Sequence, residues 1–445
     1  MTANRPTMRM RSFGLVAATV LMMGTILLPH SSEAFTTPTY TNFASDYGDA
    51  GEPSIGVNWV TGEVMFQAGF NTARVDTFND TTKTAEWNDV TPLLTVSLDP
   101  ILFTDHWTNR TFVSHLYGAC SELSYTDNDG TSWIGNAAGC ALGSAADHQT
   151  VGGGPMPPPL AGTLPPPAYP DALYYCSQAL VTSNCGASLN GGVAFNPATP
   201  SYRPGFCSGL NGHIKVAADG TAYLPHGRCG GNQAVLVTSN IGATWALRAI
   251  PDSTASNEGD PSVAIGAGGK VYFGYQEPTA TGSVARVAVS SDKGATWLPS
   301  LTVGGTTIKN VQFPTIVAGD NDRAAFAFLG TTSSGDDQAS TFAGVWHLYV
   351  ATTYDGGATW VTVDATPTDP VQRGTICMGG IGCGSGRNLL DFNGMDIDKQ
   401  GRIYVAYADG CLGCTSASGS TAAIGTIARQ STGTDLCAAV SGCAL

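Results

Sequence analysis

Polar residues, most of them acids and histidines, recur along this chain directly before short apolar segments that alternate with turns. We count seven such positions, which hold Glu52, Asp105 with His106, Asp147 with His148, His213, Asp260, Gln312 and Asp391. If these side chains meet, paired carboxylates would suit glycoside hydrolysis, and a histidine with tyrosine or arginine would suit proton abstraction in a polysaccharide lyase. A ring of acids would also suit a calcium ion.

The string DHQTVGGGP, which begins at Asp147, is the most unusual of these segments. A carboxylate beside a histidine can orient the imidazole for proton transfer, and glycines let a ligand approach the backbone. A buried, hydrogen-bonded histidine is the structural alternative. Similarly, Glu52 and Asp260 each precede a proline and could fix a turn. Asp105 could hold Arg110 or nearby amides as a loop staple.

This pattern predicts two sets of site residues. The catalytic candidates are Glu52, Asp260, His148 and Asp147, and the substrate-binding candidates are Asp105, Arg110, His213, Gln312 and Asp391. We predict no metal ligands, because the pair Cys411 and Cys414 has the spacing of half a zinc site but no second pair or neighbouring histidine completes it. We expect no cofactor, and calcium is the one ion that so acidic a chain would suit.

An octapeptide of the form SSDKGATW, which starts at Ser290, recurs along the chain. Four other segments match it in register, TDNDGTSW, SLNGGVAF, TSNIGATW and TYDGGATW, which start at Thr126, Ser188, Thr238 and Thr353. A hydroxyl residue stands first, Asp or Asn third, Gly fifth and an aromatic residue last. Asp or Asn can accept bonds from backbone amides just ahead of it, and Gly can take a positive φ. Each octapeptide is therefore predicted to be a β-hairpin turn.

The spacing of these turns predicts the fold. Their closing aromatics lie 62, 50, 52 and 63 residues apart, a period typical of a four-stranded propeller blade. Matching segments, such as PSVAIGAGGKVYFGYQ from Pro261, combine a short alternating strand, a turn and a more apolar strand. We predict an all-β propeller with seven blades, with six as the alternative. AAIGTIARQST near the C-terminus is expected to be an outer strand that closes the ring.

Two segments depart from the blade pattern. Arginines, an apolar run and Ser32-Glu33-Ala34 predict a signal peptide over residues 1–34. Residues 35–445 are then one propeller domain. The proline-rich segment at about 152–170 cannot supply ladder donors throughout, so we predict a loop inserted in the third blade. A linker between two domains is the alternative.

The cysteines and the net charge indicate where the protein acts and which partners it can bind. Twelve cysteines in an exported chain predict disulfides, and nearest-neighbour pairing gives Cys120–Cys140, Cys176–Cys185, Cys207–Cys229, Cys377–Cys383, Cys411–Cys414 and Cys437–Cys443. We expect a secreted protein, extracellular or periplasmic. The net charge of −14 argues against nucleic acid and anionic membranes as partners. We expect a monomer whose partner is an extracellular glycan or polysaccharide.

The five octapeptides resemble the Asp boxes, or BNR repeats, of the sialidase superfamily, and with their strand pairs the resemblance covers nearly all of the chain after Ala50. It implies a sialidase-like β-propeller whose Asp-box acids, such as Asp292 and Asp355, are structural. Sialidases also imply a triad of arginines that clamps the substrate carboxylate, the first of them in Arg-Ile-Pro. Here that position reads Gly51-Glu52-Pro53-Ser54-Ile55, and a glutamate there would repel sialic acid.

Two functional hypotheses follow from these observations. The first is a sialidase-like glycoside hydrolase of unknown substrate, with a polysaccharide lyase as the alternative chemistry. The second is a non-catalytic propeller that binds glycan or protein at the same rim. Two carboxylates roughly 5 to 10 Å apart across an open pocket would favour hydrolysis, whereas mutually paired acids would favour binding.

Overall fold

Seven antiparallel sheets follow one another along the chain, and their first strands meet in a ring. The computed structural model describes residues 1–2, 35–93, 99–117, 120–136, 147–158, 169–179, 181–256, 258–416, 420–440 and 442–444. The blades lie within the unit formed by residues 36–445. The segment predicted to be a signal peptide lies outside the described residues, apart from Met1 and Thr2.

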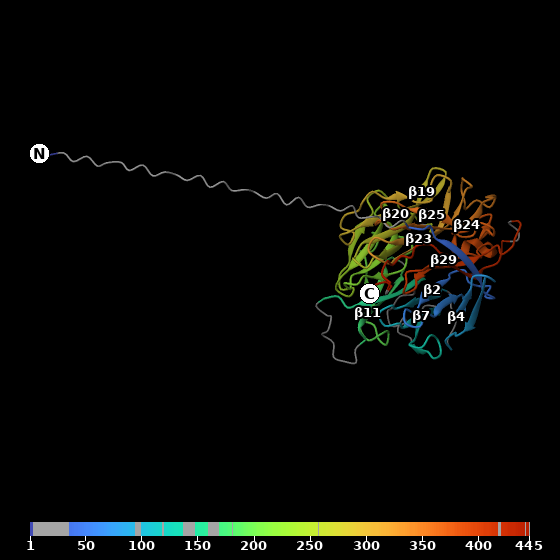
Figure 1. The fold of residues 1–445 in the computed structure, drawn as a ribbon, viewed down its shortest axis with the longest axis horizontal. Coiled ribbons are helices and arrows are strands. Elements are labelled where there is room, and N and C mark those ends of the chain that lie inside the picture. The colour runs from blue at the N-terminus through green and yellow to red at the C-terminus, as the bar shows by residue number, and fades with distance from the viewer. Residues whose placement is uncertain are drawn as a thin grey trace. The chain divides into compact units, whose positions relative to one another are not determined.

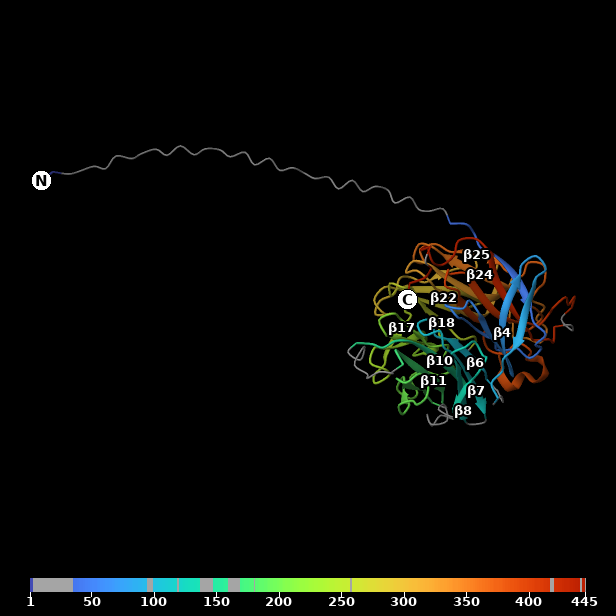
Figure 2. The ribbon, with the colours of Figure 1, turned by 60° about the horizontal axis from the view of Figure 1, so that its bottom comes forward.

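Each of the first three blades has its strands in sequence order. Blade 1 contains β2 (Ser54–Val57), β3 (Val64–Ala68), β4 (Asn71–Asn79) and β5 (Thr84–Asp89). Blade 2 contains β6 (Ile101–Thr104), β7 (Thr111–Tyr117), β8 (Cys120–Thr126) and β9 (Ile134–Asn136). Blade 3 contains β10 (Asp147–Pro155), β11 (Asp171–Gln178), β12 (Ser183–Ser188) and β13 (Thr199–Pro200). Figure 2 shows strands of blades 2 and 3 close together.

The next three blades repeat this order. Blade 4 contains β14 (Lys215–Val216), β15 (Ala222–Cys229), β16 (Asn232–Thr238) and β17 (Ala246–Ala249). Blade 5 contains β18 (Ser262–Ile265), β19 (Val271–Thr279), β20 (Gly282–Ser290) and β21 (Leu301–Thr302). Blade 6 contains β22 (Asn310–Ala318), β23 (Ala324–Thr331), β24 (Val345–Thr353) and β25 (Val361–Asp364), and β26 (Gln372–Arg373) also pairs with β24.

Blade 7 is built from both ends of the unit. It contains β27 (Gly394–Ile397), β28 (Ile403–Asp409) and β29 (Ile424–Thr432), and its fourth strand is β1 (Thr39–Ala44). In Figure 1 the blue strand β1 lies beside the red strand β29. The segment expected as the outer, closing strand is therefore the third strand of the blade. A short 3-10 helix, Gly380–Gly386, precedes β27.

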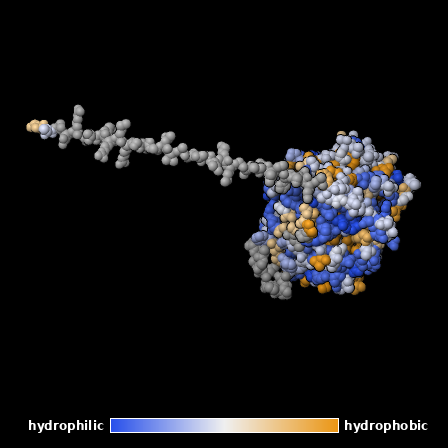
Figure 3. All heavy atoms as spheres, viewed as in Figure 1, coloured by the Kyte–Doolittle hydropathy of each residue, from blue (hydrophilic) through white to orange (hydrophobic). Residues whose placement is uncertain are grey.

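The inner strands form a closed ring, because each contacts the next and β27 contacts β2. This arrangement confirms the prediction of an all-β propeller with seven blades rather than six. Middle strands of a blade, such as β23, are buried on both faces because neighbouring blades pack against them. The outer strand β5, in contrast, has no buried residue. On the face shown in Figure 3, hydrophilic residues predominate and hydrophobic ones form small groups.

The octapeptides are hairpin turns between the third and fourth strands of blades 2 to 6. In the turn at Ser290, the Thr296 and Gly294 amides donate to Asp292 Oδ1 and Ser290 Oγ, each at 2.8 Å, and Gly294 has φ of 77°. The same bonds recur in the turns that start at Thr126, Ser188, Thr238 and Thr353. The acid or amide at the third position is thus occupied within its own turn.

The proline-rich segment lies within blade 3, between β10 and β11. β10 extends through Pro155, so Gly152 to Pro155 are strand rather than loop. Residues 159–168, the greater part of the predicted insertion, lie outside the described residues.

We predict that Phe43→Ala in β1 lowers the free energy of unfolding by about 3–5 kcal/mol, because Phe43 is fully buried and packs 4.9 Å from Phe78 in blade 1. Urea unfolding followed by tryptophan fluorescence measures the change. Phe70→Ala is the matched control, since Phe70 is 51% exposed and should change stability by no more than about 0.5 kcal/mol. Equal effects would contradict a role for β1 in closing the ring.

Candidate functional site

The starts of the inner strands converge at one end of the channel, which we call the front mouth; the other end is the back mouth. His148 at the start of β10 contacts Asp260 just before β18 and Asp391 just before β27. These residues come from blades 3, 5 and 7, which are not neighbours, so their side chains meet across the channel axis. We call the charged residues gathered here the front cluster: Glu52, Asp99, Asp147, His148, Asp260, Arg387 and Asp391.

His148 lies between two carboxylates. Its Nδ1 is 2.9 Å from Asp260 Oδ2, and its Nε2 is 3.5 Å from Asp391 Oδ2. Burial alone would lower the pKa of His148, but the charges of Asp260 and Asp391 raise it well above 6.5. The imidazole is therefore held as a cation. Its ion-pair partners are these two aspartates rather than the neighbouring Asp147 expected from the sequence, and its Nδ1 also lies 3.2 Å from the backbone carbonyl of Asn211.

A local backbone feature directs His148 inward. Its φ is +53°, and the pairing of β10 with β11 shifts register between Asp147 and Thr150. A β-bulge of this kind re-aims a side chain at the end of a strand. The bulge leaves His148 buried while Asp147, the residue before it, is exposed.

Asp391 is held in its ionised form. Burial would raise the pKa of Asp391, but His148 and the Arg387 guanidinium, which donates to both of its oxygens at 2.5 Å, lower it below 3.8. Glu52 beside it is only 2% exposed. Burial, the charges of Asp391 and Asp99 and a hydrogen bond with Asp391 raise the pKa of Glu52 well above 4.5. A protonated Glu52 thus meets an ionised Asp391.

A second acid pair, Asp99 with Asp147, is more accessible. Burial, the charge of Asp147 and a hydrogen bond with it raise the pKa of Asp99 to about 6. The side-chain amide of Gln149 donates to the backbone carbonyl of Asp99 and fixes its position. Asp99 is half-buried and Asp147 exposed. This pair places a titratable proton where a substrate at the front mouth could reach it.

Asp99 was missed among the sequence candidates, although the sequence held a signal for it. Asp99-Pro100 precedes β6 as Glu52-Pro53 precedes β2 and Asp260-Pro261 precedes β18. An acid followed by proline directly before an inner strand therefore occurs three times. The candidate taken for that blade, Asp105, lies after β6 instead of before it.

Asp105, His106 and Arg110 consequently lie away from the front mouth. Asp105 accepts bonds from the Trp107 amide at 3.0 Å and from the Tyr169 hydroxyl at 2.6 Å, which is the loop-staple arrangement. The Arg110 guanidinium donates to both oxygens of Asp127, at 2.7 and 2.8 Å, and not to Asp105.

His213 and Gln312 lie close to the front cluster without joining it. His213 packs edge-on against Phe392, with ring centroids 4.4 Å apart, and lines a cavity inside the channel. Burial, helped by the charges of Lys215 and His148, lowers its pKa to about 3, so the ring is neutral. Gln312 is buried and donates to Asp337 at 3.0 Å.

Five predicted disulfides are present: Cys176–Cys185, Cys207–Cys229, Cys377–Cys383, Cys411–Cys414 and Cys437–Cys443. The sixth predicted pair lies outside the described residues, which do not include Cys140. The pairing of Cys411 with Cys414 is the one that nearest-neighbour spacing predicts. No helix in the described part of the chain is long and apolar enough to cross a membrane.

Few potential metal-ligand atoms lie close together among the described residues. The one group of three potential ligand atoms within 4.8 Å of one another belongs to Cys207, His226 and Cys229. Two of these residues are joined by a disulfide, which leaves no thiolate to bind a metal. Calcium at the front mouth stays a prediction.

No family model matches this chain, and no curated protein matches it. Several solved structures are similar in architecture. A protein of unknown function from Dyadobacter fermentans is 11% identical with a TM-score of 0.43, and the alignment covers 89% of this chain and 98% of that one. An ulvan lyase is 9% identical with a TM-score of 0.49, over 92% and 98%.

A Trypanosoma rangeli sialidase mutant with trans-sialidase activity is 12% identical with a TM-score of 0.43, over 84% of this chain and 60% of that one. At identities this low and TM-scores below 0.5, these similarities say nothing of the activity of this chain.

We predict that His148→Gln costs about 3–5 kcal/mol of unfolding free energy near neutral pH, because it leaves the largely buried Asp260 carboxylate without its cation and Asp391 with Arg387 alone. The pKa of His148 is raised on folding, so its stabilisation is complete below pH 6.5 and is lost as the pH rises through the folded value. Denaturant unfolding of both proteins across this range measures the difference.

His115→Gln provides a control of opposite sign. His115 is buried in β7, and burial lowers its pKa to about 4. The difference between wild type and this variant should therefore shrink as the pH falls below 6.5. The same pH trend in both variants would contradict the ion-paired state of His148.

Proposed function

We propose that this protein is an exported glycoside hydrolase that acts at the front mouth, with Asp99 as the proton donor. The separation of pKa values within one small group of acids carries this proposal. Asp99 has a pKa near 6, whereas Asp391 is held ionised. Hydrolysis of a glycosidic bond requires one protonated and one ionised carboxyl group, and a site that drives pKa values apart supplies both.

The roles follow from exposure and charge. Asp99 protonates the glycosidic oxygen as its bond to the sugar breaks, and a water molecule then adds to the anomeric carbon and returns a proton to Asp99. Asp147 keeps that proton on Asp99 by raising the pKa of Asp99. Asp391 supplies the negative charge that favours the positively charged transition state, and Arg387 with His148 fixes its position. Buried Glu52 and partly buried Asp260 support these groups and need not touch the sugar.

The charge of the front cluster favours an uncharged glycan as the substrate. Its two cations, Arg387 and His148, are both paired with aspartates, so neither is free to bind a substrate carboxylate. Asp147 remains exposed and negative at the rim. A sialoside or uronic acid would meet repulsion here, which agrees with the glutamate found in place of the first sialidase arginine.

Glycan binding without turnover is the second candidate. It is favoured by the mutual pairing of the acids, Glu52 with Asp391 and Asp99 with Asp147. Such pairing is what we expect of a binding rim. Catalytic hydrogen bonds often rearrange when the substrate arrives, however, so pairing in the free protein does not decide against hydrolysis.

We predict that the purified chain from Phe35 onwards releases sugars from a neutral polysaccharide in a panel that also contains sialosides and uronic acid polymers. Asp99→Asn should lower kcat/KM by about 10²–10⁴-fold, the usual contribution of a general acid. Asp219→Asn, which removes a half-exposed acid paired with Lys293 on the surface, is the control and should keep full activity. Binding of glycans on an array without any hydrolysis would favour the second candidate.

We also predict that activity falls as the pH rises through about 6, because the general acid must be protonated and the pKa of Asp99 lies there. Asp147→Asn removes the charge that helps to raise this pKa, so the falling limb should move to lower pH. Profiles of kcat/KM against pH for both proteins provide the measurement. An unmoved limb in Asp147→Asn would show that Asp99 is not the titrating acid.

A further inference from the structure

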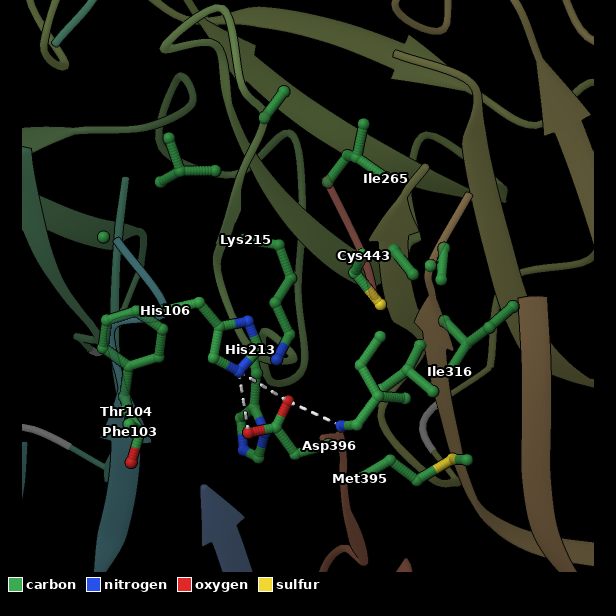
Figure 4. Close-up of a pocket in the computed structure, with 18 of the residues that line it drawn as sticks. Phe103, Thr104, His106, His213, Lys215, Ile265, Ile316, Met395, Asp396 and Cys443 are labelled. Carbon is green, nitrogen blue, oxygen red and sulfur yellow. Dashed lines mark hydrogen bonds and ion pairs between the residues drawn. The ribbon is translucent and has the colours of Figure 1, made fainter. Parts of the chain in front are cut away.

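The channel contains a cavity of about 170 Å³ that is separate from the front cluster. Residues from all seven inner strands line it, together with Cys443 and Ala444 near the C-terminus. Most of the wall is apolar, with Ile55, Ile101, Val151, Ile265, Ile316 and Met395 among its residues. Four titratable side chains also line it, those of His106, His213, Lys215 and Asp396 (Figure 4).

The side chains of Asp396 and His106 are hydrogen-bonded to each other. His106 Nε2 lies 3.1 Å from the Asp396 carboxylate, which also accepts the Val57 amide at 2.8 Å and the Ile397 amide at 2.9 Å. The imidazole of His106 is stacked on Trp59, with ring centroids 4.0 Å apart. This pair is therefore a fixed part of the wall.

Lys215 is different, because its ammonium makes no hydrogen bond and no ion pair with any described residue. It stands on β14 and points into the cavity in Figure 4. Burial lowers the pKa of Lys215, and the charge of Asp396 opposes this shift. An ammonium has three donors and no acceptor, and leaving them unpaired among apolar walls is costly. Lys215 is only partly buried, so water or a bound ligand can supply the acceptor that the described residues do not.

His213 limits what that acceptor can be. Its ring is neutral and borders the cavity beside Phe392, so it adds a polar contact without adding charge. Lys215 is then the one cation facing the cavity that no anion of the described residues contacts. A carboxylate pairs with an ammonium through charge-assisted hydrogen bonds, which are stronger than neutral ones.

We propose that this cavity binds a small organic carboxylate with an apolar body, whose carboxylate oxygens accept hydrogen bonds from Lys215 Nζ. The apolar strands of the channel enclose the body of the ligand, and the lysine fixes its orientation, as in small-molecule sites generally. This site lies behind the front mouth and does not depend on the activity proposed for the front cluster.

Calorimetric titration with benzoate and with benzyl alcohol tests the proposal, because the two probes differ chiefly in charge. Wild type should bind benzoate about tenfold or more tightly than the alcohol, as expected for one charge-assisted hydrogen bond. Lys215→Met should abolish that preference. Lys293→Met, at a half-exposed lysine, and Asp99→Asn, in the front cluster, should both retain it.

A measurement on the wild type guards against loss of the fold in Lys215→Met. Benzoate should slow reductive methylation of Lys215, followed by mass spectrometry, and leave Lys293 unaffected. The proposal is overturned if benzoate does not bind saturably, if the two probes bind equally, or if the preference persists in a folded Lys215→Met. Protection of both lysines alike would also overturn it.

Discussion

The pairing of β1 with β29 is the constraint on which the rest of the structure depends. Six blades are each complete within one stretch of chain, but blade 7 takes its outer strand from the other end of the unit. Without β1, the strand β29 would expose an unpaired edge, which costs hydrogen bonds and invites association. The ring also fixes where the inner strands start, so the front cluster exists only when the ring is closed.

The front cluster shows how a buried group of acids can be tolerated at the centre of such a ring. Five carboxyl groups face two cations, and the excess charge is reduced by protonation of Glu52 and by sharing of His148 between two aspartates. Charges taken out of water need partners, and His148 finds its two aspartates on two other blades while Arg387 pairs with Asp391 in its own segment. The contacts that give these acids different pKa values also link blades 1, 3, 5 and 7 across the channel.

Much of the fold was predictable from the sequence, because its signals are local. The octapeptide turns depend on hydrogen bonds within eight residues, and the strand pairs on alternation within about sixteen, as in PSVAIGAGGKVYFGYQ. The convergence of His148, Asp260 and Asp391 was predictable from the ring, because inner strands of a propeller start at the same end of the channel. The role of β1 was not predictable, because a single short strand carries no mark of a partner at the far end. The prediction placed Asp105 at the front mouth. Its inner strand, however, begins before it, at Ile101, so Asp105 lies at the far end of that strand.

Closure by β1 also has a consequence for the order of events during synthesis. Thr39 pairs with Thr432, so the first strand to be made must remain without its neighbour until almost the whole chain has been translated. Contacts between such distant positions form slowly, since a long loop has to close first. The ring can therefore reach its final form only after translation is nearly complete, although the six blades that are complete in sequence can form earlier.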